Sequence, residues 1–471
     1  MPNHRFIAAL AFAACASPAL AGGTAEVVLR AVGSYQPGQT VDVAIDFADI
    51  AAPVVGGQFH FSYDATQLEY VGVLAGDGPF TNVIYQSDAA VDASTRRVVG
   101  AVGVDAETPG AGIAAGRLAI VRFTAKSDAA LCRSTDALNF ILSGPPILLT
   151  DGEGNSLAFT AVDDVDLTLD GVAPVLSAVP AADIVLATDA GSTVGAVVAD
   201  PTVTANDNCN GALTVTISTT GATIGSAWPV DGVFAIGTTT VVWSATDASG
   251  NSTSETRTIT VEDHQLLDAT LALDGAFAGS STRSVRIGAG ASTQIVEVAF
   301  TGPNGTASGV EVPVAASYDC LVAKSRDHSI SATAAASVSG TRYSASFALA
   351  QGDSNDDNVV DVLDFGLFVG DIGGPVATNA ISNFNADPVV NNADFSFISL
   401  NFFEAGATCG AANGATPRHR VSVKELRRSG LGHLAVADLN RDGWVDLRDM
   451  AFYSENGTNP AVRPGGDAPI E

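Results

Sequence analysis

Apolar and polar residues alternate along much of this chain, and this alternation constrains the fold more than any other feature. It is clearest in residues 41–47, 59–63 and 118–123. A period of two places successive side chains on opposite faces of a strand, so that one face can be buried. No helical periodicity competes with it between residues 25 and 170. The pattern therefore predicts a mainly β chain built from sandwiches.

The N-terminus predicts secretion. His4 and Arg5 precede an apolar run from Phe6 to Cys15, and Ala19 and Ala21 form an A-x-A cleavage pattern. We expect residues 1–21 to be a signal peptide, which places the protein outside the cell or at its surface. A lipoprotein anchor at Cys15 is the less favoured alternative, because no leucine-containing lipobox precedes it. No later run reaches about 18 apolar residues, so no membrane span is expected.

Acidic residues dominate the charge. There are 51 acidic against 22 basic residues, for a net charge of −29. Such a chain repels nucleic acids and anionic membranes and attracts divalent cations. The simpler explanation is solubility outside the cell, but the local clustering of Asp and Asn described below favours cations.

Four cysteines remain after the signal peptide, at Cys132, Cys209, Cys320 and Cys409. An oxidising compartment permits two disulfides, and four cysteines allow three connectivities. We favour Cys320–Cys409, because both residues flank the same C-terminal module. This choice leaves Cys132 and Cys209 as an inter-domain pair. No CxxC pattern indicates redox or zinc chemistry.

Two segments of the first sandwich resemble a cohesin domain. Gly57–Val71 reads GQFHFSYDATQLEYV, and Gly116–Phe123 reads GRLAIVRF. The resemblance covers most of residues 22–170. It implies a non-catalytic sandwich that binds dockerin modules and that is related in shape to carbohydrate-binding modules.

The next segment, residues 171–263, resembles a HYR domain, an immunoglobulin-like sandwich linked to adhesion. The resemblance rests on four stretches, which are Ala173–Leu176, Pro201–Cys209, Phe234–Val241 and Ala245–Asn251. We interpret residues 247–251, DASGN, as turn chemistry. Ser177 and Thr256 stand where many members of the family carry cysteines. Residues 264–350 resemble a small carboxypeptidase-regulatory-like or transthyretin-like sandwich through the alternating runs 295–300 and 310–314.

Three windows near the C-terminus follow the EF-hand ligand pattern. Calcium takes oxygen ligands at loop positions 1, 3, 5, 7, 9 and 12, with a sharp turn at position 6. The predicted ligands of loop 1 are Asp353, Asn355, Asp357, Val359, Asp361 and Asp364. Those of loop 2 are Asn383, Asn385, Asp387, Val389, Asn391 and Asp394. Those of loop 3 are Asp438, Asn440, Asp442, Trp444, Asp446 and Asp449.

Loops 1 and 2 are followed by apolar helix-like segments, Phe365–Val369 and Phe395–Phe403. Such a pair resembles a dockerin, a module that folds on calcium and docks to cohesins. Loop 2 departs from the pattern because Pro388 occupies position 6, where its locked φ prevents the usual glycine turn. We therefore predict Ca²⁺ at loops 1 and 3 and weak or no binding at loop 2.

The remaining residues, 409–471, hold a basic segment, loop 3 and a tail. Ser422 and Glu425 have the spacing of a helix start, which makes residues 421–457 a fuller EF-hand. The basic residues are expected to balance acidic neighbours. They are Arg418, Arg420, Lys424, Arg427 and Arg428.

The predicted order is a signal peptide (1–21), a cohesin-like sandwich (22–170), an immunoglobulin-like domain (171–263), a small sandwich (264–350), dockerin-like repeats (351–408) and the third loop with its flanks (409–471). No catalytic motif occurs and no block is large enough for a catalytic barrel, so we predict that the chain is not an enzyme.

We expect calcium-dependent assembly through cohesin–dockerin pairing with secreted or cell-surface proteins, including self-association. The alternative is a polysaccharide-binding accessory protein. That role needs an exposed aromatic platform, and residues 22–170 contain no tryptophan.

Overall fold

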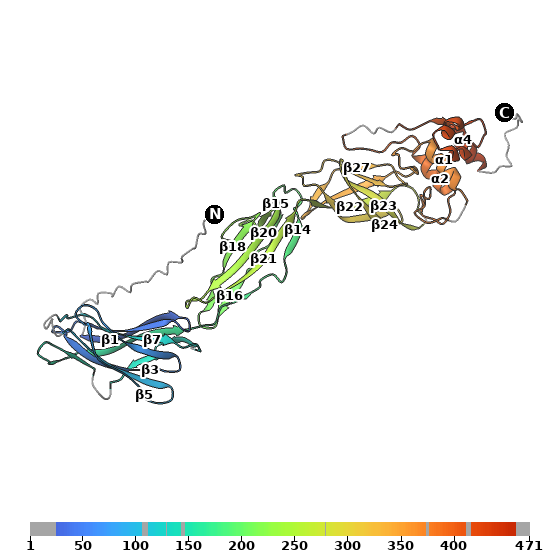
Figure 1. The fold of residues 1–471 in the computed structure, drawn as a ribbon. Coiled ribbons are helices and arrows are strands. Elements are labelled where there is room, and N and C mark those ends of the chain that lie inside the picture. Colours follow the sequence, from blue (N-terminus) through green and yellow to red (C-terminus); the bar gives the residue numbers. More distant parts are fainter. Residues whose placement is uncertain are drawn as a thin grey trace. The chain divides into compact units, whose positions relative to one another are not determined.

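The structure is a computed structural model that describes residues 25–105, 112–128, 130–142, 147–277, 279–373, 376–410 and 416–457 (Figure 1). The predicted signal peptide lies outside these residues. The chain forms two compact units. Unit 1 comprises residues 1–179, 201–217 and 242–256, and unit 2 comprises residues 180–200, 218–241 and 257–471. Strands predominate over helices in the described residues, as the alternation predicts. None of the described helices has the length and hydropathy needed to cross a membrane.

The N-terminal sandwich consists of two facing sheets. The first has the order β4 (Leu68–Ala75), β7 (Gly116–Ala125), β2 (Thr40–Ala48), β1 (Glu26–Tyr35), β12 (Thr160–Leu169) and β8 (Leu131–Ser134). The second has the order β11 (Ser156–Leu157), β10 (Leu148–Thr150), β3 (Gly56–Asp64), β6 (Thr95–Gly103) and β5 (Asn82–Ala90), with β9 (Leu138–Phe140) also paired to β3.

The alternating residues fill the core between these sheets. Phe59 and Phe61 of β3 and Phe123 of β7 are all fully buried, and the rings of Phe61 and Phe123 lie 6.2 Å apart. The strands β1 and β12 pair in parallel along their whole length, while their other neighbours are antiparallel. The predicted burial of alternate residues is confirmed for the apolar residues of 41–47 in β2, whereas in β3 His60, on the face opposite Phe59 and Phe61, is buried as well.

Three small sheets follow between residues 175 and 262. They are β13 (Val175–Ser177), β16 (Thr204–Asp207) and β17 (Gly211–Leu213); β14 (Ile184–Ala187), β21 (Ser252–Glu262), β20 (Gly237–Thr246) and β18 (Thr216–Gly221); and β15 (Gly195–Val197) with β19 (Val233–Ala235). The turn Asp247–Asn251 is held by Asn251, whose backbone N–H donates to Asp247 Oδ1 at 2.8 Å. The predicted turn chemistry is confirmed.

An eight-stranded sheet occupies residues 265–349. Its order is β27 (Ala332–Ala334), β26 (Leu321–Ser325), β23 (Ser280–Ala289), β24 (Ser292–Thr301), β25 (Asn304–Val312), β22 (Gln265–Leu273), β29 (Arg342–Leu349) and β28 (Ser337–Ser339). The strands β24 and β25 pair only beside their turn. The two halves of the sheet therefore diverge and share one core, to which Val285, Leu271 and Phe347 contribute.

The C-terminal part of unit 2 is helical (Figure 1). It contains α1 (Val362–Asp371), α2 (Asn392–Leu400), β30 (Arg420–Ser422), α3 (Val423–Arg428), η1 (Gly432–Ala437), β31 (Trp444–Asp446) and α4 (Leu447–Asn456). The helices expected after loops 1 and 2 are confirmed, although α2 ends at Leu400 rather than Phe403. Phe403 has a φ of 70°, which a helix does not permit. Ser422 caps α3 by accepting a bond from the backbone N–H of Glu425 at 3.1 Å, as predicted.

Both predicted disulfides are present. Cys132 pairs with Cys209, and Cys320 pairs with Cys409. The second links the eight-stranded sheet to the segment after α2. This helical part also shares a core with Ile330 of the sheet region. The helices and the sheet of unit 2 therefore pack as one body.

Candidate functional site

The three predicted calcium loops share one backbone design, organised by the carboxylate at position 12. In loop 1 this residue is Asp364, whose Oδ1 accepts bonds from the N–H groups of Ser354 at 2.8 Å and Asn355 at 3.2 Å. Its Oδ2 accepts a bond from the N–H of Asp361 at 2.8 Å. The equivalent bonds recur at Asp394 in loop 2 and at Asp449 in loop 3.

Each loop also starts the helix that follows it. The residue at position 9 is the N-cap, and the residue at position 12 closes a capping box with it. The three N-caps are Asp361, Asn391 and Asp446. A short polar sequence therefore folds locally into both a loop and a helix start, which explains why the spacing could be recognised without the tertiary structure.

The first residue of each loop has one side-chain oxygen that no protein group satisfies. Oδ1 is buried and has no hydrogen-bond partner at Asp353, Asn383 and Asp438. A buried polar atom without a partner costs free energy. An oxygen in that state at the same position of three oxygen-rich loops suits a hard cation, which takes oxygen ligands. The residues of loops 1 and 3 therefore fit calcium.

Loop 2 holds its first residue differently. In loops 1 and 3 the residue at position 6 has positive φ, 70° at Asn358 and 87° at Gly443. Their N–H groups donate to Oδ2 of Asp353 at 2.9 Å and of Asp438 at 3.1 Å. Pro388 has no N–H to donate.

The amide of Asn383 substitutes for this bond. Its Nδ2 donates to the carbonyl oxygens of Ala377 at 2.9 Å and Asp387 at 2.7 Å. Loop 2 thus keeps the shape of its neighbours through neutral hydrogen bonds. Only Asp387 and Asp394 among its predicted ligands carry charge, so this loop is the poorest of the three for a cation.

Within loop 1, and likewise within loop 3, the carboxylates repel one another and are partly buried. Burial raises the pKa of Asp353 to about 6 and that of Asp449 to about 6. Burial also raises the pKa of Asp364 well above its usual value, and the charge of Asp353 adds to the effect. Both causes destabilise the ionised form, and a bound divalent cation would oppose them.

One lysine of the sheet region reaches loop 1, and no local sequence signal indicated it. Lys324 on β26 is buried, and its Nζ lies 2.6 Å from Oδ2 of Asp353 and 3.0 Å from Oδ1 of Asp356. Arg286 also pairs with Asp356. These contacts fasten loop 1 to the sheet and leave Oδ1 of Asp353 as the oxygen available to a cation.

A buried arginine fastens loop 2 in a similar way. Arg283 on β23 is 1% exposed. It donates to Oε1 of Gln351 at 2.6 Å and to the carbonyl oxygens of Asn383 at 3.2 Å and Phe384 at 2.9 Å. The positions of loops 1 and 2 therefore depend on positively charged side chains of strands that precede the loops by 29 to 101 residues.

A buried histidine, His328, lies beside this attachment. The ring is 4% exposed. Its Nδ1 lies 2.7 Å from the carbonyl oxygen of Arg326 and its Nε2 lies 3.1 Å from that of Ala380. Burial, followed by repulsion from Arg283, lowers the pKa of His328 to about 3.

Since the unfolded chain takes up this proton near pH 6.5, His328 is expected to destabilise unit 2 progressively as the pH falls from about 6.5 towards 3, by up to about 1.4 kcal/mol per pH unit. His328→Gln should remove this slope in urea titrations with chelator present. The exposed His433→Gln is the control and should keep it. Parallel curves for wild type and His328→Gln would contradict the assignment.

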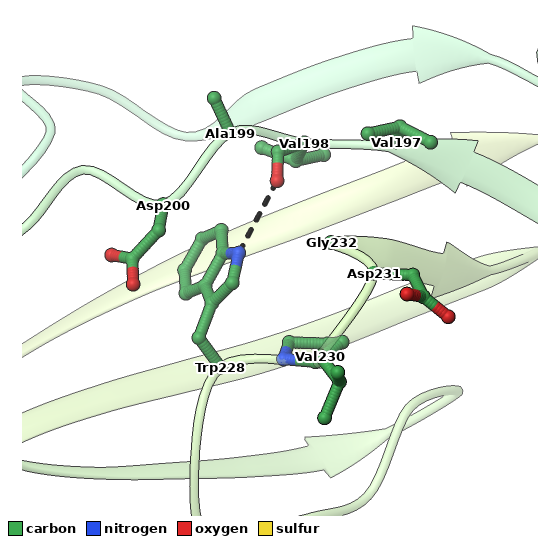
Figure 2. Close-up of a pocket in the computed structure, with 9 residues that line it drawn as sticks. Val197, Val198, Ala199, Asp200, Trp228, Val230, Asp231 and Gly232 are labelled. Carbon is green, nitrogen blue, oxygen red and sulfur yellow. Dashed lines mark hydrogen bonds between the residues drawn. The ribbon is translucent and has the colours of Figure 1, made fainter.

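Trp228 lines the hollow that Figure 2 shows, in unit 2. The hollow has a volume of about 370 Å³ and is bordered by residues 197–200 and 228–232. The indole N–H donates to the carbonyl oxygen of Val198 at 3.2 Å, and the ring packs edge-on against Phe234 at 5.0 Å. Because these contacts hold the indole, the hollow does not present a flat, exposed aromatic platform.

Of the predicted basic residues, Arg420 stacks over the ring of Trp444, with the guanidinium carbon 4.5 Å from the ring centroid. Trp444 stands at position 7 of loop 3, where its backbone carbonyl is the predicted ligand. The stacking and the pairing of β30 with β31 hold this part of loop 3 in place.

The comparison with curated proteins gave no significant match. Three solved structures that resemble part of the chain are cohesins. CaCohA2 from Clostridium acetobutylicum is 20% identical, covers 32% of this chain and 94% of its own length, and gives a TM-score of 0.25. The sixth cohesin of scaffoldin B from Acetivibrio cellulolyticus, solved in complex with a Cel5 dockerin, is 17% identical, covers 31% and 99%, and gives 0.23. A non-cellulosomal cohesin from Archaeoglobus fulgidus is 18% identical, covers 31% and 92%, and gives 0.22.

Among protein-family models, that of the cohesin domain matches residues 25–140. This range contains both stretches on which the resemblance was based, Gly57–Val71 and Gly116–Phe123. It also contains strands β1–β9, and therefore most of both sheets. The N-terminal sandwich of this chain carries a cohesin domain.

Proposed function

We propose that this chain is a secreted, non-catalytic assembly protein, in which the cohesin domain binds a dockerin-type module and the C-terminal loops form a calcium-dependent module of that type. The observation that carries the proposal is the presence, in one chain, of the cohesin match and of three loops that share one oxygen-rich design. The HYR-like residues 171–263 add an adhesive spacer to this scheme. No part of the proposal requires catalysis.

Calcium dependence is proposed from the first residues of loops 1 and 3. Each offers one buried oxygen without a partner, beside three further predicted carboxylate ligands. The ligands would be Asp353, Asn355, Asp357, Val359, Asp361 and Asp364 in loop 1, and Asp438, Asn440, Asp442, Trp444, Asp446 and Asp449 in loop 3. Bound calcium would neutralise these carboxylates and stabilise the starts of α1 and α4.

We place the partner on the sheet that ends in β5. The register of β5 against β6 shifts between Val83 and Tyr85. Two adjacent large apolar side chains are consequently exposed, Ile84 at 65% and Tyr85 at 54%. Aromatic side chains flanked by apolar surface commonly anchor protein interfaces. The partner can be the C-terminal module of a second copy or that of another secreted protein.

Size-exclusion chromatography with light scattering tests the self-assembly form of this proposal. The molar mass of the full chain is expected to rise with concentration in calcium and to stay monomeric in chelator. Tyr85→Ala should weaken the association. Val71→Ala, at a 57% exposed position on β4 of the other sheet, is the control. A monomer of unchanged dimensions under all conditions would reject self-assembly and require a partner from another chain.

Polysaccharide binding remains the alternative. Ile84 and Tyr85 would have to form its platform on the cohesin domain, because Trp228 is engaged by Val198 and Phe234. Retention of the full chain on insoluble polysaccharides, abolished by Tyr85→Ala, would favour this alternative over assembly.

A further inference from the structure

Three aspartates from distant parts of the sequence meet within unit 1. Asp170 follows β12 of the N-terminal sandwich, Asp207 ends β16, and Asp247 follows β20. One carboxylate oxygen from each lies within 4.8 Å of the others. The three residues are 1%, 3% and 6% exposed. This group lies outside the three calcium loops and was not anticipated from the sequence, where residues 247–251 indicated only a turn.

Backbone bonds orient these carboxylates but do not neutralise them. Asp170 Oδ1 accepts from the N–H of Val172 at 2.9 Å. Asp207 Oδ1 accepts from the N–H groups of Cys209 and Asn210, each at 2.9 Å. The second oxygen of each, Oδ2, is buried and has no partner. These two oxygens are therefore left for a ligand.

The turn that carries Asp247 is held in place by hydrogen bonds from Asn251. Both oxygens of Asp247 accept bonds from Asn251, from its N–H and from its Nδ2, each at 2.8 Å. The same Nδ2 donates to the carbonyl oxygen of Asp170 at 2.8 Å, so the turn is held against the end of β12. Ser249 in this turn is 6% exposed, and its Oγ also has no partner.

Within the described residues, the charges in this group have no counter-ion. In the described part of the chain, no lysine, arginine or histidine forms an ion pair with any of the three aspartates. Burial of an unpaired carboxylate destabilises the fold, and like charges within 4.8 Å of one another add to that cost. An all-oxygen set of this kind suits calcium, which accepts irregular oxygen geometry, better than zinc, which favours nitrogen and sulfur ligands.

We propose that Asp170, Asp207 and Asp247 bind one calcium ion. The ion would join the last strand of the cohesin-bearing sandwich to the turns after β16 and β20. The disulfide between Cys132 and Cys209 ties the same turn to β8. Calcium and disulfide together would make this junction rigid, independently of the C-terminal loops.

The site is tested by a substitution whose effect on the unfolding temperature should change sign between chelator and calcium. Asp207→Asn keeps the side-chain oxygen that orients the turn but removes one negative charge. In chelator the variant is expected to unfold at a higher temperature than wild type, because it relieves the repulsion. In calcium it is expected to unfold at a lower temperature, and its calcium affinity at this site should fall by at least about tenfold.

Hydrogen exchange of the full chain locates the response. Calcium is expected to slow exchange in peptides covering residues 204–210 and 245–252 of wild type but not of Asp207→Asn. These peptides are distinct from the C-terminal loops, so the result does not depend on calcium binding there. Asp151→Asn is the matched control, because Oδ1 of this partly exposed aspartate accepts hydrogen bonds from the backbone N–H groups of Glu153 at 3.0 Å and Asn155 at 2.8 Å. It should leave the calcium response unchanged.

Two results would overturn the proposal. One is a loss of stability in Asp207→Asn that is equal in chelator and in calcium, since this would show that Asp207 only supports the turn. The other is unchanged exchange of both peptides in wild type on addition of calcium. If Asp207→Asn fails to fold, Asp170→Asn replaces it with the same expectations, because Asp170 Oδ1 accepts only one turn bond, from Val172. Protection by zinc but not by calcium would also reject the assignment.

Discussion

Removal of calcium from the full chain is expected to lower the free energy of unfolding of unit 2 by about 4 kcal/mol for each occupied loop, when calcium is held about a thousandfold above its Kd. The reason is that calcium would bind only the folded loops, where the buried Oδ1 atoms of Asp353 and Asp438 have no hydrogen-bond partner. Urea unfolding in calcium and in chelator measures the difference. Calorimetric titration of the full chain counts the sites, and we expect two at the C-terminal loops in addition to the one proposed at Asp170, Asp207 and Asp247.

Three variants assign these sites. Asp353→Asn and Asp438→Asn should each remove one C-terminal site, because each takes away a charged ligand while keeping the size of the side chain. Asn383→Ala is the comparison in loop 2. It should lower stability, since the carbonyl oxygens of Ala377 and Asp387 lose their donor, yet leave the number of sites unchanged. Loss of a site in Asn383→Ala, or no heat from wild type, would contradict this scheme.

Replacement of Arg283 is expected to cost about 3–5 kcal/mol of the stability of unit 2. Arg283→Met preserves much of the apolar stem, but it leaves the side chain of Gln351 and the carbonyl oxygens of Asn383 and Phe384 without their buried donor. The helical part should then separate from the sheet at lower denaturant concentration. We expect two unfolding transitions in place of one when intrinsic aromatic fluorescence and far-UV circular dichroism are measured in the same denaturant titration.

The control for this change is Arg342→Met. Arg342 pairs with Asp268 at 3.1 Å, and both side chains are 42% exposed. Exposed pairs of this kind contribute at most about 1 kcal/mol. If both variants lose equally little stability, Arg283 does not fasten loop 2 to the sheet. The packing of the helices against the sheet would then depend on their shared apolar core and on the Cys320–Cys409 disulfide.

These experiments require the full chain, because the C-terminal module makes contacts that lie before the starting residue that its sequence pattern predicts. Residue 351 was expected to start the module. In the structure its core includes Ile330, loop 1 binds Lys324, and loop 2 binds Arg283. A fragment that begins at residue 351 would lack all three contacts and would expose their partners to water.

Local patterns were sufficient for those features whose stabilising contacts lie within a few residues. Strand alternation predicted the buried rings of Phe59 and Phe61, because a strand presents alternate side chains to the core whichever strand lies beside it. The odd spacing of Asp and Asn predicted the shape of the three loops, because the bonds of Asp364 and of its two counterparts span at most ten residues. The departure of loop 2 from the common pattern at Pro388 could be predicted from the sequence for the same reason.

Contacts between distant residues were decided by the tertiary structure. Lys324 and Arg283 look like ordinary charged strand residues until the sheet places them beneath loops 1 and 2. Asp170, Asp207 and Asp247 are separated in the sequence by 37 and 40 residues, and only the packing of their three turns brings the carboxylates together. The sequence by itself determined where polar loops and strands form, since short-range bonds control them, whereas the fold alone determined which buried charges share a site, since burial and proximity arise only when distant segments pack.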